Sequence, residues 1–152
     1  MAVATTTAAV AKAKAARVSL VLKPSNGGPF ADFILGDDLH IGILDHTHAL
    51  VTSFYPCGIR SEPQPLSWTS GIELCSCGTH IDSSFIASFL RGATHRYNAQ
   101  TYHASTFNCF DFVLDFVDFR GSKQDFVDSY VKVPLLRAVC PSMLVNRDVK
   151  YF

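Results

Sequence analysis

Apolar and polar residues alternate in four short segments, at residues 18–23, 39–45, 49–55 and 71–75, and most of these segments are rich in β-branched residues. A spacing of two is typical of strands that bury one face. Turn residues separate the segments, and the short connection after residue 45 predicts a hairpin between the second and the third. The sequence therefore predicts a small antiparallel sheet.

A helical spacing of apolar residues dominates residues 107–119. One apolar stripe consists of Phe110, Val113, Leu114 and Val117, and a second consists of Phe112, Phe116 and Phe119. Because most of its circumference is apolar, this helix is expected to lie centrally and to pack on the sheet. The predicted fold class is α+β, a small antiparallel sheet packed on a central helix.

Shorter helices are predicted on either side of the central one. Asp82 is placed to cap a helix over residues 83–90, which Gly92 would end. A short amphipathic helix is predicted over residues 123–130. Residues 56–70 contain proline, glycine and tryptophan without a regular pattern, which predicts an irregular loop that crosses one face of the sheet.

The length of 152 residues fits one domain over residues 18–152, preceded by a basic, alanine-rich tail over residues 1–17 that is either mobile or docks on a partner. The 13 basic and 13 acidic residues give no basic surface for nucleic acid, and no apolar run of about 18 residues predicts a membrane span. Only 17% of residues are charged while 12% are aromatic, a balance that favours a protein partner or a protein substrate.

The five cysteines form an odd set without regular spacing, and the chain shows no secretory signal. These features favour a reducing compartment and predict a cytoplasmic location. Cys75 and Cys77, together with Cys57 and His80, invite a zinc site, but the spacing lacks a second regular pair of ligands. We therefore predict ordinary thiols, with no metal and no cofactor.

The candidate chemistry lies in two stretches. Cys109 falls in the first turn of the central helix, where the positive end of the helix dipole is expected to lower the pKa of the thiol. His40 is held on a predicted strand beside Gly42, which leaves room for a group to approach. A histidine facing the cysteine would activate it as a nucleophile, although a histidine on a strand is also a common structural residue.

These stretches resemble a known group of enzymes. The segments His40-Ile41-Gly42-Ile43 and Asn108-Cys109-Phe110-Asp111-Phe112 are similar to the motifs of the circularly permuted papain-like and NlpC/P60-like cysteine peptidases, particularly the PPPDE peptidases. In that pattern a histidine strand precedes an Asn-Cys helix start. Phe110 stands where the PPPDE motif usually has a second asparagine, so the groove beside the thiol is expected to be more apolar.

A longer similarity, over roughly residues 18–137, is to the makorin-2 opposite-strand protein family. The matching pieces, in order, are Ser19-Leu20-Val21-Leu22-Lys23-Pro24, Asp38-Leu39-His40-Ile41-Gly42-Ile43, His95-Arg96-Tyr97, Asn108-Cys109 and Phe126-Val127-Asp128-Ser129-Tyr130-Val131. The cysteine-containing segment that precedes this region in the vertebrate members is absent here.

The resemblance implies two functions from different classes. In the first, the domain is a cysteine-dependent hydrolase or acyl-transfer enzyme for an amide, isopeptide or thioester bond, with Cys109 and His40 as the catalytic pair. Substrate would then be bound by Asn108, Phe110 and Gly42. In the second, the papain-like domain is catalytically inactive and serves as a structural or adaptor subunit.

Access to Cys109 separates the two functions. Asn108 at the helix entrance favours a polar surrounding, so we predict that Cys109 is partly accessible. The thiol is then expected to react with iodoacetamide faster than that of Cys140. A thiol sealed against the sheet would instead have a raised pKa and would favour the inactive domain.

Overall fold

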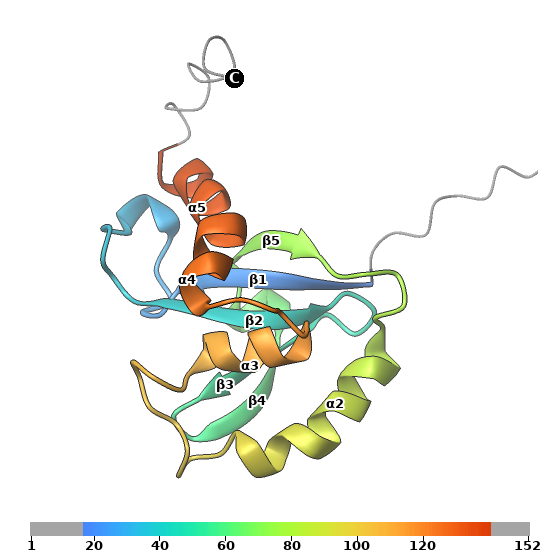
Figure 1. The fold of residues 1–152 in the computed structure, drawn as a ribbon. Helices are drawn as coiled ribbons and strands as arrows, with labels where there is room; N and C mark the ends of the chain where they lie inside the picture. Colours follow the sequence, from blue (N-terminus) through green and yellow to red (C-terminus); the bar gives the residue numbers. More distant parts are fainter. Residues whose placement is uncertain (1–16, 141–152) are drawn as a thin grey trace, which may run out of the picture.

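The computed structural model describes residues 17–140, so the predicted N-terminal tail lies outside the described residues except for Arg17. Strands occupy mainly the first half of this region and helices the second (Figure 1). The elements are β1 (Val18–Pro24), η1 (Phe30–Asp32), β2 (Leu39–Asp45), β3 (Leu50–Tyr55), β4 (Gly58–Pro63), α1 (Gln64–Ser67), β5 (Ile72–Ser76), α2 (Ser83–Arg96), α3 (Cys109–Phe116), α4 (Lys123–Phe126), η2 (Val127–Val131) and α5 (Lys132–Val139).

The strands form one antiparallel sheet in the order β4-β3-β2-β1-β5. The α+β class and all four predicted strands are confirmed, but the prediction of an irregular loop over residues 56–70 is wrong in its first half. Residues 58–63 form β4, which pairs with β3 from Tyr55↔Gly58 to Leu50↔Pro63. As an edge strand β4 buries little side-chain surface, so its sequence lacks the alternation that marks the other strands.

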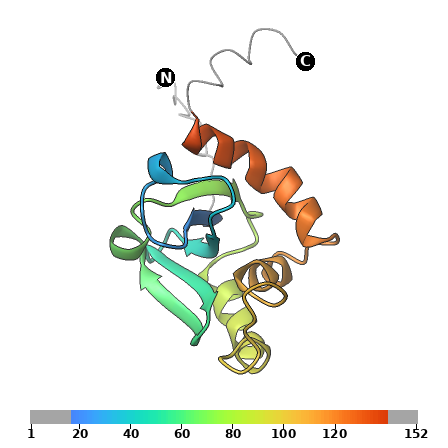
Figure 2. The same cartoon turned by 90° about the vertical axis from the view of Figure 1, so that its left-hand side faces the viewer.

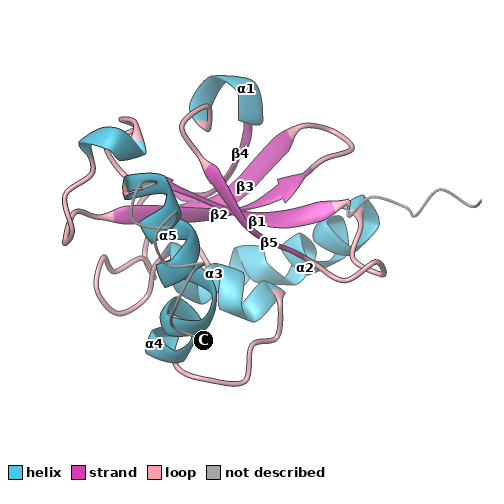
Figure 3. Cartoon of the chain, turned by 90° about the horizontal axis from the view of Figure 1, so that it is seen from above, coloured by secondary structure: helices cyan, strands magenta, loops and turns pink. Residues whose placement is uncertain are grey.

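One face of the sheet carries the main core. Inward residues of the strands, such as Leu20, Ile41 and Phe54, pack against α3 in a single apolar cluster. Helices α2, α3, α4 and α5 all lie on this side (Figure 3). The prediction of a central helix on the sheet is therefore confirmed, since α3 contacts both β2 and β3.

Helix α3 is shorter than residues 107–119, and the face that it turns to the core takes residues from both predicted apolar strips. Phe112, Val113 and Phe116 are fully or almost fully buried, whereas Phe110 and Leu114 are only half-buried. The core face thus combines Phe112 and Phe116 of one strip with Val113 of the other. Periodicity could not separate the two strips, because both have helical spacing and together cover most of the helix.

The other face of the sheet has its own small cluster, formed by Val21, Leu44, Val51 and Trp68. Trp68 follows α1, and Figure 3 shows α1 on the side of the sheet away from the other helices. The predicted crossing of a sheet face is confirmed for this second half of the segment. Figure 2 shows the β3–β4 hairpin at one side of the molecule and α5 at the other.

Helix α2 begins where the sequence predicts, because the Asp82 carboxylate accepts a hydrogen bond from the Phe85 amide at 3.0 Å. The prediction that Gly92 ends it is wrong, since the helix continues to Arg96. No atom lies within 4 Å of a Cβ placed on Gly92, so the glycine is an exposed interior residue with a cost of about 1 kcal/mol. Within residues 17–140, no helix combines the length and apolar character needed to cross a membrane.

Candidate functional site

Four of the five predicted site residues line one cavity of about 310 Å³, at the place where β2 and α3 both begin. They are His40, Asn108, Cys109 and Phe110. The remaining walls come from Ser25, Asp37, Asp38, Leu39, Tyr102 and Ala104. Residues 69 positions apart in the sequence therefore meet at a single site, as the resemblance implies.

The start of α3 is fixed by a capping box. The side-chain oxygen of Asn108 accepts a hydrogen bond from the Phe110 amide at 3.0 Å, and the Asn108 amide donates to the Asp111 carboxylate at 2.8 Å. The Asn108 side-chain nitrogen donates to the Ala104 carbonyl at 2.7 Å. Both ends of the Asn108 side chain are thus engaged in positioning Cys109 as the first residue of the helix.

Cys109 is 4% exposed, and its burial raises the pKa of the thiol to about 11. Backbone hydrogen bonding at Ile41, Cys109 and Phe110 acts in the opposite direction but is outweighed. The predictions of a partly accessible thiol and of a lowered pKa are therefore wrong. The helix start does present donors to the sulfur, yet loss of water around a charged thiolate is the larger effect.

The sulfur lies beside an opening in the sheet. The pairing of β2 with β3 runs from Asp45↔Leu50 to Ile43↔Thr52 and stops there. At the next step the Ser53 hydroxyl, rather than a backbone amide, donates to the Ile41 carbonyl at 2.5 Å. The strands have separated at this point, and the backbone of Ile41 is within hydrogen-bonding reach of Cys109.

His40 is 8% exposed, and its ring lies on the face of the sheet opposite α3. Neighbouring residues of a strand point to opposite faces, and Ile41 belongs to the core on which α3 packs. The centroid of the His40 ring is 4.3 Å from that of Tyr55 and 5.5 Å from that of Trp68. Among the described residues, no hydrogen bond joins His40 to Cys109.

The proton on the His40 ring can be assigned from its partner. The Nε2 atom lies 3.0 Å from the Ser53 hydroxyl, whose single proton is already donated to the Ile41 carbonyl. Nε2 therefore carries a proton and donates it to Ser53. In the neutral ring Nδ1 is then the acceptor, and it is the nitrogen that remains for any partner in the cavity.

Burial, reinforced by the positive charge of Lys23, lowers the pKa of His40 to about 4, whereas Glu62 acts in the opposite direction. The Lys23 ammonium lies 4.3 Å from the centroid of the Trp68 ring. The Glu62 carboxylate accepts hydrogen bonds from Tyr55 and Trp68. His40 thus belongs to a satisfied polar cluster on the second face, where the neutral imidazole is favoured.

Gly42 does not line the cavity. A Cβ atom at this position would lie 2.6 Å from a methyl group of Val51 and 3.1 Å from the Trp68 ring. The groups that approach Gly42 are therefore Val51 and Trp68, which belong to the small apolar cluster on the second face of the sheet (the second core). Gly42 leaves room for another group to approach, as predicted, but the side chains of Val51 and Trp68 occupy that space.

Ser53 is the residue that sequence reasoning missed. Two other polar residues lie near His40 in the sequence: the Tyr55 ring packs against the His40 ring at an interplanar angle of 44°, whereas the Asp45 carboxylate lies 2.8 Å from Nδ1 of His48. The sequence offers one signal for Ser53. It lies two residues before Tyr55, so both side chains point to the same face of a strand that is predicted to pair with the strand of His40. A serine on a half-buried strand has too many structural uses for that signal to be decisive.

A zinc site is not formed by the predicted candidates. Within residues 17–140, no cluster of three or more histidine, cysteine or acidic side chains is arranged to hold a metal ion. Cys57 lies in the turn between β3 and β4, whereas Cys75 belongs to β5 at the other edge of the sheet. The five cysteines are all free thiols.

The fold and the site define an α+β domain in which a histidine-bearing strand and the cysteine-bearing start of a helix border one cavity. The chain matches the DUF4796 C-terminal family over residues 5–144 and therefore belongs to this family, a domain of unknown function. Comparison with curated proteins gives no match.

Proposed function

We propose that this chain is a permuted papain-like domain of the NlpC/P60-like type whose His40 and Cys109 are catalytically silent, and that it acts as a structural or adaptor subunit for a protein partner. The observation that carries the proposal is the state of the pair. Cys109 is a buried thiol with a raised pKa, while His40 donates to Ser53 within an aromatic cluster on the other face of the sheet.

The protonation states oppose catalysis. A cysteine–histidine pair works when the thiol proton passes to the imidazole. Here the thiol of Cys109 has a pKa of about 11 and the imidazolium of His40 a pKa of about 4. Both shifts oppose that transfer, because burial favours the neutral thiol and the neutral imidazole.

The papain-like assignment is supported by the order and placement of the elements. The histidine strand precedes the Asn-Cys helix start in the chain, and the helix packs on an antiparallel sheet that contains that strand. This arrangement fits the PPPDE pattern and the similarity to the makorin-2 opposite-strand proteins. Free thiols throughout the chain support a cytoplasmic location.

The loop between η1 and β2 is the surface that best fits a protein partner. Ile34 and Leu35 are each 71% exposed, and they are followed by Asp37 and Asp38 on the wall of the cavity. Two adjacent, solvent-exposed aliphatic side chains next to a hollow are typical of a binding surface.

The proposal is tested by labelling and by co-purification. Electrophilic probes built on ubiquitin-like C termini, and acyl probes, are expected not to label Cys109. In cells, the Cys109→Ser variant is expected to co-purify the same partners as the wild type, whereas Ile34→Ser combined with Leu35→Ser is expected to lose them. Labelling that disappears in both Cys109→Ser and His40→Gln would overturn the silent assignment.

A cysteine-dependent hydrolase is the second candidate, and the shared cavity favours it. Cys109 and His40 border the same 310 Å³ space, Nδ1 of His40 is an acceptor, and backbone donors surround the sulfur as in an oxyanion hole. Catalysis would require the ring to leave Ser53 and the thiol to gain access to substrate. A Ser53→Ala variant that gains probe labelling at Cys109 would support this candidate, and one that stays unlabelled would count against it.

A further inference from the structure

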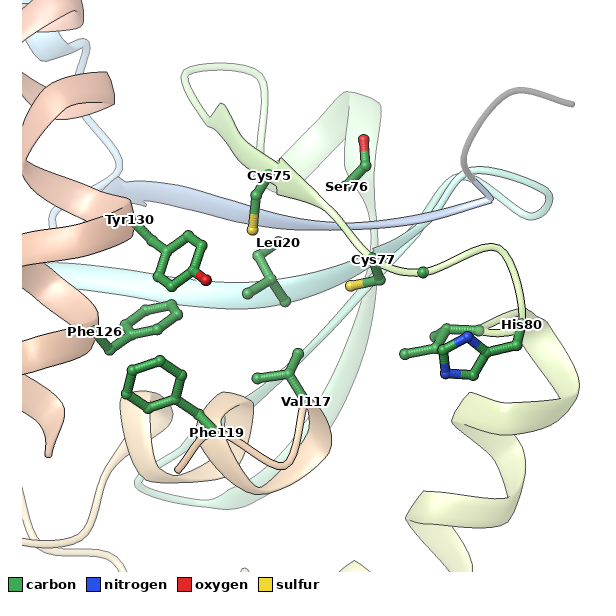
Figure 4. A pocket seen from close by; sticks show the side chains of 11 residues that line it. Leu20, Cys75, Ser76, Cys77, His80, Val117, Phe119, Phe126 and Tyr130 are labelled. Atoms are coloured by element: carbon green, nitrogen blue, oxygen red, sulfur yellow. The ribbon is translucent and has the colours of Figure 1, made fainter. Parts of the chain in front are cut away.

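A second cavity, also of about 310 Å³, lies between β5 and the helices that follow α3 (Figure 4). Its sheet side is formed by Leu20, Cys75 and Cys77, and its helix side by Val117, Phe119, Phe126 and Tyr130. None of these seven side chains carries a formal charge. These walls are thus mainly apolar and aromatic, and the polar groups around the cavity are the two thiols, the Tyr130 hydroxyl, Ser76 and His80.

The two thiols come from the same face of the same strand segment. Cys75 pairs with Leu20 of β1, and the Cys77 amide donates to the Val18 carbonyl at 2.8 Å. Residues two apart on a strand point to the same side. Figure 4 shows both sulfur atoms directed into the cavity on either side of Leu20.

We propose that Cys75 and Cys77 form a two-coordinate site for a soft monovalent metal ion, Cu(I). Thiolates are soft ligands and select Cu(I) over the harder ions. Burial raises the pKa of both thiols, that of Cys77 to about 12, so the ion itself has to displace their protons. Binding would form two Cu–S bonds and release the two thiol protons to solvent, with no change in the oxidation state of the metal or the sulfur. This inference is independent of the function proposed for His40 and Cys109.

The spacing of the two residues suits this geometry. Residues two apart on a strand are separated by about 6.6 Å, at 3.3 Å per residue. An ion midway between two sulfurs needs them about 4.6 Å apart if its bonds to sulfur are as long as a zinc–thiolate bond, about 2.3 Å. Binding therefore requires the two cysteine side chains to turn toward each other about their Cα–Cβ bonds.

The number of ligands excludes a structural zinc site here. Zinc requires four ligands in such sites, and the part of the chain spanning residues 17–140 offers no suitable group of three. His80 lines the same cavity, but its ring packs on Gly78, where a Cβ atom would lie 2.7 Å from the imidazole. Two sulfurs are the donor set that remains.

The rest of the cavity suits a soft ion. Its walls are mainly aromatic and aliphatic, and the apolar shell around a metal controls its redox behaviour. Tyr130 reaches the cavity from η2, a turn of π-helix between α4 and α5, and its ring lies 5.4 Å from that of Phe126. Such turns are rare and are often found at functional sites.

The test is a titration of the full chain with Cu(I) under reducing, oxygen-free conditions, with bicinchoninate as a coloured competitor. The wild type is expected to bind one tight equivalent. Cys75→Ser and Cys77→Ser are each expected to weaken binding by at least about 100-fold, because loss of a ligand exceeds the 10–100-fold effect of an outer-shell partner. Circular dichroism of each variant shows whether the fold is retained.

Cys57→Ser is the matched control, since this thiol is exposed and lies at the other edge of the sheet. It is expected to change the affinity by less than about threefold, and so is His80→Gln. X-ray absorption at the copper edge is expected to show two sulfur ligands. Unchanged binding in the folded Cys75→Ser variant, or loss in Cys57→Ser, would overturn the site, and loss in His80→Gln would overturn the two-sulfur geometry.

Discussion

Replacing His40 by glutamine removes one titrating group from the second face of the sheet and keeps a side-chain amide that can donate to Ser53. In the wild type the pKa of His40 is about 4, mainly because the ring is buried. In the unfolded chain the pKa returns to about 6.5. Between these two values the unfolded chain binds one more proton than the folded chain.

The free energy of unfolding is therefore expected to fall as the pH is lowered. A buried neutral histidine contributes its full stability above the unfolded pKa, and stability falls as the pH drops from about 6.5 toward 4. With these two pKa values, the free energy of unfolding of the wild type is expected to fall by about 2 kcal/mol between pH 7 and pH 5 from His40 alone. His40→Gln lacks this contribution.

The assay is urea unfolding of both proteins at several pH values from 7 to 5. At pH 7, the difference in the free energy of unfolding between the two proteins reports the packing lost in the variant. The change in this difference with pH reports the titration of His40. The other histidines and the carboxylates contribute equally to both proteins, so the difference isolates one residue. Parallel pH profiles for the two proteins would refute a buried, neutral His40, as would an NMR titration with a pKa near 6.5.

Three further predictions concern the thiol, the second core and the main core. In the folded protein, iodoacetamide is expected to modify Cys57 at least about tenfold faster than Cys109, because only the former thiol is exposed; peptide mass mapping at equal rates would contradict this. Gly42→Ala is expected to destabilise the fold by about 1–3 kcal/mol through its contacts in the second core, whereas Gly92→Ala, with free space around it, should stabilise by up to about 1 kcal/mol in urea unfolding. Phe112→Ala is expected to cost about 3–5 kcal/mol in the same assay, since the ring is fully buried under α3, and a loss below 1 kcal/mol would refute its central place.

Four of the five strands were predictable from the sequence, including β5 at one edge of the sheet, whereas β4 at the other edge was not. Segments such as residues 39–45 and 49–55 alternate because their side chains meet a core. In β4 only Gly58 is buried, so the composition of residues 58–63 reflects a turn and an exposed edge. Its pairing with β3 is decided by the hairpin geometry, in which Gly58 has a φ of +116°.

The sequence also led, through the order of its two motifs, to two residues that border one cavity, His40 and Cys109. It did not predict the burial of their side chains or the raised pKa of the thiol. Whether their side chains face each other depends on strand parity, and the predicted alternation already placed His40 on the face opposite Ile41. The serine that holds the ring, and the opening between β2 and β3, depend on tertiary contacts that no local pattern encodes.

Burial of the Cys109 sulfur gives the strongest physical reason why a cysteine at a helix start is not reactive here. A helix dipole stabilises an adjacent negative charge by at most about 2 kcal/mol. The thiol pKa of Cys109, about two units above its ordinary value of 9.0, reflects a net opposing effect of about 3 kcal/mol after the backbone donors have acted. Asp37 and Asp38 line the same cavity, and none of its lining residues is a lysine or arginine. Reactive cysteines lie in electropositive, partly exposed surroundings, so both burial and local charge favour the protonated thiol at this helix start.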